Sequence, residues 1–131
     1  MLKDEKLTSQ IIACAHKVHN TLGSGFLEKV YENAMMIELA KSGLKVEQQA
    51  RISVIYEGQP VGDYYADLFV ENAIIVECKA LVAIVREHEV QLVNYLVATG
   101  IDTGLLINFG PSVAVRRKFR EYRKSKAIGQ D

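Results

Sequence analysis

The chain has 131 residues, of which 49% are hydrophobic and 24% are charged, and its formal net charge is zero. This length fits one domain with an ordinary core, and no apolar run approaches the roughly 20 residues of a membrane-spanning helix. A zero net charge argues against a strongly basic nucleic-acid binder, yet the charge is uneven. Residues 1–115 hold 9 Lys and Arg against 14 Asp and Glu, whereas residues 116–126 hold 7 basic residues and one acidic residue.

The chain shows no sign of secretion or of a disulfide framework. Its first ten residues, MLKDEKLTSQ, carry acidic groups where a secretory signal has its apolar stretch. Cys14 and Cys78 fall in segments that read as a helix and a buried strand, so each is better explained as a small buried hydrophobe. We therefore expect a cytoplasmic protein with reduced cysteines.

The N-terminal third has the apolar spacing of two helices. Between residues 7 and 22 apolar side chains recur every three or four positions, and Gly23-Ser24-Gly25 ends this helix. A second helical pattern runs from residue 27 to residue 39 and ends at Ser42-Gly43, where glycine suits a left-handed C-cap. His16 and His19 lie one turn apart on the first helix, where two partly buried histidines are a better explanation than a metal pair.

The rest of the chain reads as strands interrupted by one helix. From residue 46 the period becomes two, through ISVIY, a turn at residues 57–60, and the runs VGDYYADLFV and AIIVECKA around Glu71-Asn72, which predicts an antiparallel meander. Residues 85–99 read as a helix, the apolar strand GLLINF should join the sheet by a crossover, and residues 113–119 supply a last strand. The fold class is α/β, with element order ααβββαββ and a mixed sheet flanked by helices. We expect one domain over residues 1–120 and a disordered basic C-terminal tail over residues 121–131.

Three ionisable residues stand in the apolar run ADLFVENAIIVECKA, which covers residues 66–80. Opposed residues of a hairpin have numbers with a constant sum, so Asp67 faces Glu77 only if Asn72 is the centre of a three-residue loop. A two-residue Glu71-Asn72 turn would oppose Asp67 to Val76 and separate the two carboxylates. The loop length therefore decides whether a paired-carboxylate site exists.

Strand alternation places Glu77 and Lys79 on one face and Ile74, Val76 and Cys78 on the other, packed against helices. Two carboxylates at this spacing repel each other unless a cation lies between them, and hard oxygen ligands suit Mg²⁺ or Mn²⁺. The alternative is a Glu-Lys pair at the solvated rim of the sheet, with the aspartate in a turn.

The spacing of Asp67 and Glu77-Cys78-Lys79 on a hairpin followed by a helix resembles the PD-(D/E)XK nuclease superfamily. GFLEKVY, residues 25–31, matches the pattern that names the GxxExxY protein family. The blocks VHNTLGSGFLEKVYENAM, YEGQPVGDYYADLFVENAIIVECKA, QLVNYL and LLINFG resemble that family in the same order, over roughly residues 8 to 120.

This resemblance implies a restriction-endonuclease-like core in which Asp67 and Glu77 hold a divalent ion, Mg²⁺ or Mn²⁺. It further implies that Lys79 orients or activates the attacking water and that Glu28 adds a ligand. The residues agree on the last point, because Glu28 is an acid in the first turn after a glycine-rich break, although a helix-capping role explains it equally well. Cys78 replaces the usual aliphatic residue of the motif. Its side chain should face the core and only its backbone carbonyl the metal.

The later helix offers further groups, since Gln91 and Tyr95 lie at i and i+4 and His88 one turn earlier on the same face. Gln91 and Tyr95 resemble the QxxxY element of RecB-like members, where such residues position the nucleic acid or the water. Amphipathic packing is the alternative explanation of Tyr95, and a polar rim position that of Gln91. We also expect nucleic-acid contacts from a set of basic and aromatic or imidazole side chains. They are Arg116, Arg117, Lys118, Arg120, Tyr31 and His88.

The preferred hypothesis is a metal-dependent nuclease that hydrolyses DNA through Asp67, Glu77, Lys79, Gln91 and Tyr95. Because the site is acidic, the basic run from Arg116 to Lys126 or a second subunit of a homodimer has to grip the phosphates, although such a run is more often a solvated end. The alternatives are a catalytically inactive nuclease-fold module that binds nucleic acid or a protein partner, and a different metal-assisted hydrolase.

Overall fold

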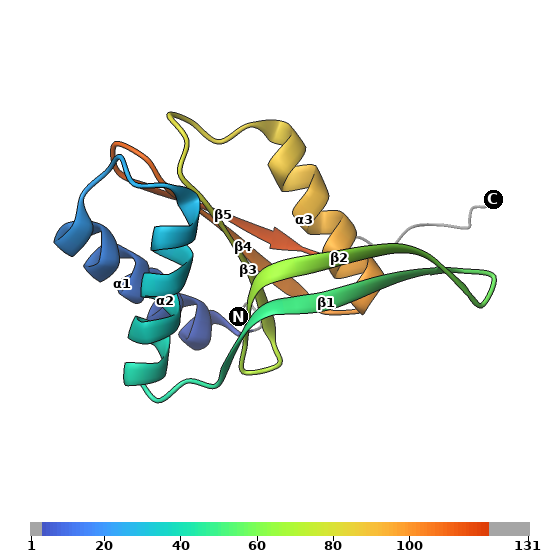
Figure 1. Cartoon of the computed structure of the whole chain (residues 1–131). Helices are drawn as coiled ribbons and strands as arrows, with labels where there is room; N and C mark the ends of the chain where they lie inside the picture. Colours follow the sequence, from blue (N-terminus) through green and yellow to red (C-terminus); the bar gives the residue numbers. More distant parts are fainter. Residues whose placement is uncertain (1–3, 121–131) are drawn as a thin grey trace.

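The computed structural model describes residues 4–120, which form three helices and one five-stranded mixed sheet (Figure 1). In chain order the elements are α1 (Glu5–Leu22), α2 (Glu28–Lys41), β1 (Val46–Tyr56), β2 (Gln59–Val70), β3 (Ile74–Lys79), α3 (Arg86–Thr99), β4 (Thr103–Phe109) and β5 (Val113–Phe119). The predicted order ααβββαββ and fold class are confirmed. The expected basic tail over residues 121–131 lies outside the described residues. Within residues 4–120, every helix is too short or too polar to cross a bilayer.

The strands lie in the sheet in their sequence order, β1-β2-β3-β4-β5. The first three are antiparallel neighbours, β3 and β4 are parallel across the α3 crossover, and β5 pairs antiparallel with β4. The meander and the crossover were both predicted. The turn between β1 and β2 is shorter than expected: only Glu57 and Gly58 form it, both with positive φ, and Gln59 and Pro60 already belong to β2.

Helices cover both faces of the sheet, and each face has its own core. Ile74, Val76 and Cys78 of β3 pack with α1 and α2, as strand alternation predicted, whereas Ile75 packs with Leu92, Leu96 and other α3 residues. Because α3 covers the face to which Glu77 belongs, that carboxylate is only 5% exposed. The solvated-rim alternative for Glu77 is therefore wrong.

At one position along the β1–β2 pair, the side chains that face one core change to the other core. Leu68 packs in the core beneath α1 and α2, yet Ala66, two residues earlier, packs in the core beneath α3. On the opposing strand Gln48 reaches α2, whereas Ala50 packs beneath α3. Strict alternation would keep each pair on one face, so the reversal lies between them, at Asp67 and at Gln49, whose φ is 55°.

Three loops meet at the edge of the sheet where β3 and β4 end, seen at the top of the sheet in Figure 1. Asn108, only 2% exposed, fixes the loop after β3, since its side chain accepts a hydrogen bond from Leu81 N–H and donates one to the Leu81 carbonyl. His19 binds the Gly110 carbonyl through Nε2 at 2.8 Å, which ties α1 to the β4–β5 loop. That imidazole therefore has a structural partner, and His16 is exposed.

Tyr31 fixes the loop between α1 and α2. Its ring is fully buried and stacks on Phe109 with centroids 4.8 Å apart. Its hydroxyl donates to the Gly23 carbonyl at 2.7 Å and accepts from Phe26 N–H at 3.2 Å. The expectation that Tyr31 contacts nucleic acid is therefore wrong, because the side chain is used inside the core.

We predict that Tyr31→Phe lowers the free energy of unfolding by about 1–3 kcal/mol, because the variant loses the two hydrogen bonds that the Tyr31 hydroxyl makes with the backbone of Gly23 and Phe26. Urea unfolding followed by circular dichroism measures the change. Tyr56→Phe is the matched control: Tyr56 is 65% exposed, and its hydroxyl should contribute less than about 0.5 kcal/mol. Equal stability of the two variants would contradict the structural role of Tyr31.

Candidate active site

The β2–β3 hairpin has the register that brings the two carboxylates together. Leu68 pairs with Val76, Phe69 with Ile75 and Val70 with Ile74, so every pair sums to 144. Continuing this register opposes Asp67 to Glu77 across a loop of residues 71–73. Glu71 and Asn72 have φ of 54° and 53°, so the left-handed conformation expected at Asn72 extends to its neighbour.

The Glu77 carboxylate is anchored by the backbone of Asp67, and the Asp67 carboxylate by the backbone of Cys78. The backbone pairing of β2 with β3 stops at Leu68 and Val76. Beyond this point Glu77 Oε2 accepts a hydrogen bond from Asp67 N–H at 2.7 Å, and Asp67 Oδ2 accepts one from Cys78 N–H at 2.8 Å. Each carboxylate is thus oriented through one oxygen. The other oxygen of Glu77 is left for a further ligand, and that of Asp67 has the Gln49 amide at 3.5 Å.

Burial and mutual repulsion keep protons on this pair. Burial is the main cause that raises the pKa of Asp67 to about 6, and the nearby charges of Glu32 and Glu28 add to it against the opposing hydrogen bond from Cys78. Burial raises the pKa of Glu77 to about 8, and the charge of Asp67 is the second cause. The Lys79 ammonium lowers both pKa values but does not restore them. The site therefore lacks positive charge.

Glu28 is the first residue of α2, and the geometry of that segment explains the GxxExxY pattern physically. Gly25 has φ of 105°, a conformation that other residues rarely adopt, and Tyr31 holds the loop on both sides of it. The helix therefore begins where the Glu28 charge acts on both Asp67 and Glu77.

Sequence reasoning missed a hydrogen-bonded network behind Asp67. Glu32, one turn after Glu28, is 2% exposed and accepts hydrogen bonds from Lys29, Gln48 and Gln49. Burial alone would raise the pKa of Glu32, but these hydrogen bonds outweigh it and lower the pKa below its ordinary value. The same Gln49 amide lies 3.5 Å from Asp67 Oδ1. The i, i+4 spacing from Glu28 was the one available signal.

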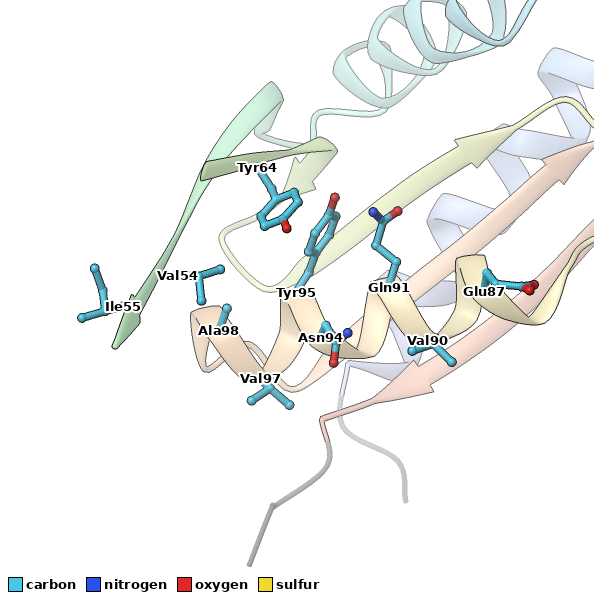
Figure 2. Close-up of a pocket in the computed structure, with 10 residues that line it drawn as sticks. All are labelled: Val54, Ile55, Tyr64, Glu87, Val90, Gln91, Asn94, Tyr95, Val97 and Ala98. Atoms are coloured by element: carbon cyan, nitrogen blue, oxygen red, sulfur yellow. The ribbon is translucent and has the colours of Figure 1, made fainter. Parts of the chain in front are cut away.

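Tyr95 of α3 lies within the electrostatic influence of the two carboxylates, and Gln91 precedes it by one turn. Tyr95 is 7% exposed, and burial followed by the charges of Glu77 and Asp67 raises its pKa to about 12. Gln91 is exposed one turn earlier, and both side chains point from α3 toward the β1–β2 hairpin (Figure 2). His88 is half-buried and is not part of the groove that these two line; its buried Nδ1 has no hydrogen-bond partner within residues 4–120.

The basic residues expected to grip phosphates lie on or next to β5. Arg116 and Lys118 face α3, where both approach Glu89, at 4.0 and 3.2 Å. Arg120 pairs with Asp102 at 2.8 Å. Arg117 lies between the two α3-facing residues, so strand alternation points it to the opposite face. Much of this positive charge is therefore already compensated.

The residues fit a divalent ion with few protein ligands. Among residues 4–120 no group of three or more His, Cys, Asp or Glu side chains is arranged to hold an ion, so Glu28 does not complete a three-residue cluster. Mg²⁺, however, is often held by only one or two carboxylates and keeps several waters. Two adjacent carboxylates with raised pKa values meet that requirement. Cys78 has its side chain in the core, as expected from the motif.

A mixed sheet with helices on both faces and paired carboxylates on adjacent strands defines a restriction-endonuclease-like domain. A model of the PD-(D/E)XK nuclease superfamily matches residues 5–121, and the chain belongs to this superfamily. The finer match to the GxxExxY family stays a prediction.

The fold is also found in a solved structure named "Crystal structure of SSO0001". It matches with a TM-score of 0.59 and 16% sequence identity, over 93% of this chain. The match spans 62% of that chain, so this protein is similar to part of a larger one. The search of curated proteins found no match.

We predict that the metal-free protein becomes less stable as the pH rises from 5 to 8. The unfolded chain loses the protons of Asp67 and Glu77 above about pH 4, whereas the folded chain keeps them up to about pH 6 and 8. Each retained proton therefore costs roughly 1.4 kcal/mol per pH unit in that window. Urea unfolding in EDTA at several pH values measures the slope.

Glu77→Gln should flatten this slope above pH 6, because the amide oxygen can still accept from Asp67 N–H but no proton is exchanged. Glu47→Gln, at an exposed position of β1, serves as the control and should keep the wild-type slope. A steep slope that persists in Glu77→Gln would show that the effect originates elsewhere.

Proposed function

We propose that this protein is a divalent-metal-dependent nuclease that hydrolyses phosphodiester bonds of DNA. The pairing of Asp67 with Glu77 carries the proposal, because a half-buried and a buried carboxylate that repel each other beside Lys79 form a site that a small hard cation would stabilise. Membership of the superfamily supports it, since PD-(D/E)XK nucleases generally use divalent metal ions.

In this proposal Asp67 and Glu77 would hold Mg²⁺ or Mn²⁺ together with the Cys78 carbonyl, and Glu28 would act on the ion through its nearby negative charge. Such an ion would polarise the phosphate as a Lewis acid and would lower the pKa of a nearby water. Lys79 orients that water and stabilises the negative charge that develops on the phosphate. Tyr95 keeps its proton at neutral pH, so that its hydroxyl donates a hydrogen bond, and Gln91 helps to position the strand.

An inactive module is the less favoured candidate on energetic grounds. Burying two adjacent carboxylates costs free energy unless a cation compensates them, and removing Glu77 would relieve that cost in a protein with no use for an ion. The phosphate contacts beyond the site are assigned to Arg116, Arg117, Lys118 and Arg120, or to a second subunit.

We predict that the protein cleaves DNA only with Mg²⁺ or Mn²⁺ and that Asp67→Asn and Lys79→Ala each slow cleavage by about 100-fold or more. Two substrates are used, a supercoiled plasmid and a circular single-stranded DNA, with the products separated on agarose. Lys45→Ala, at an exposed position before β1, should cleave like the wild type. Cleavage that survives in both site variants, or no cleavage of either substrate, would overturn the proposal.

We also predict that Mn²⁺ raises the melting temperature, and by more at pH 8 than at pH 5, because the ion competes with the protons of Asp67 and Glu77. Differential scanning fluorimetry measures the shift. Glu77→Gln and Asp67→Asn should each abolish it, whereas Glu47→Gln should retain it. An equal shift in all four proteins would mean that Mn²⁺ binds somewhere else.

A further inference from the structure

A groove of about 710 Å³ lies between α3 and the outer part of the β1–β2 hairpin. Residues 53–65 of this hairpin form an arm that is largely exposed and extends past the sheet in Figure 1. Figure 2 shows the groove, with Val54 and Tyr64 on the arm side and Val90, Gln91 and Tyr95 on the α3 side. Its volume is in the range of small-molecule sites.

The groove adjoins the carboxylates through Tyr95. That side chain lines the groove and also lies within the electrostatic influence of Glu77 and Asp67. Tyr64 faces it from the arm, with ring centroids 5.6 Å apart and a tilt of 45° between the planes. Tyr64 is 45% exposed, so part of its ring is open to a ligand.

The charge of the groove suits an uncharged, planar group. The ten lining residues include no Lys or Arg, and Glu87 is the one acidic residue among them. A groove for phosphates needs cations, and here the nearby cations of β5 pair with Glu89 instead. The Gln91 amide offers both a donor and an acceptor, as the edge of a nucleobase requires, and makes no hydrogen bond within residues 4–120.

We propose that this groove binds one unpaired nucleobase of the substrate strand, next to the phosphate held at Asp67 and Glu77. Tyr64 supplies the stacking face, and Gln91 meets the base edge. A base inside a duplex is stacked on its neighbours and paired with the opposite strand, so it cannot enter the groove. The substrate is therefore single-stranded nucleic acid or a locally opened end. This inference rests on the proposed nuclease function and narrows its substrate class.

The test measures binding rather than cleavage. Fluorescence anisotropy in Ca²⁺ compares four labelled probes of about 12 nucleotides: oligothymidylate, oligouridylate, an abasic backbone of the same charge, and a duplex. Oligothymidylate or oligouridylate should bind about tenfold or more tightly than the abasic and duplex probes, and the tighter of the two is the preferred kind of single strand. Equal affinity for the abasic or duplex probe would overturn the inference.

Variants at Tyr64 separate stacking from folding. Tyr64→Ala should weaken binding of the preferred single strand about tenfold and leave the abasic probe unaffected, whereas Tyr64→Phe should bind like the wild type. Tyr56→Ala, on the arm but outside the groove, is the matched control and should change nothing. Unchanged affinity in Tyr64→Ala would overturn the inference.

The groove would instead be a contact between two copies if sedimentation shows that the wild type forms a dimer that Tyr64→Ala dissociates with no change in nucleic-acid affinity. That outcome would also overturn the inference. Base-dependent binding without cleavage of any DNA would refute the nuclease proposal and leave the nucleobase site standing. Metal-dependent cleavage of intact duplex that is insensitive to Tyr64→Ala would do the reverse.

Discussion

The site depends on two hydrogen bonds from backbone N–H groups to carboxylates, which take the place of backbone pairing between β2 and β3. Where β2 and β3 separate, the Asp67 and Cys78 N–H groups lose their strand partners, and the carboxylates of Glu77 and Asp67 accept their hydrogen bonds instead. Buried N–H groups need partners, so the two acids are held in place by the requirement of the backbone. The free energy that orients them comes from folding, and their repulsion is the cost.

Three groups of side chains around Asp67 and Glu77 position the neighbouring segments of the site. Asn108 fixes the chain just after Lys79, Tyr31 sets the start of the helix that carries Glu28, and the Glu32 network approaches Asp67 from behind. None of the three side chains needs to touch a substrate to matter.

Much of this architecture follows from local patterns in the sequence. The helical and strand periods predicted the element order. The loop centred on Asn72 predicted the register, because Asn is one of the few residues that tolerate the left-handed conformation. The roles of Tyr31 and Gln49 were not predictable in the same way. A tyrosine one turn from a glutamate looks the same whether its hydroxyl faces solvent or a buried carbonyl. Gln49 has a positive φ and donates a hydrogen bond to Glu32, 17 residues away in sequence, and no local pattern encodes such a distant partner.

The β1–β2 hairpin, in which the faces reverse at Gln49 and Asp67, has a packed part and an exposed part. The strand residues next to the reversal pack in the two cores, while the outer arm, residues 53–65, is largely exposed. Insertions, deletions or substitutions in this arm would leave the carboxylates in place. Changes in the arm can therefore alter the groove while the paired carboxylates stay in place, because the arm lies outside the packed part of the hairpin.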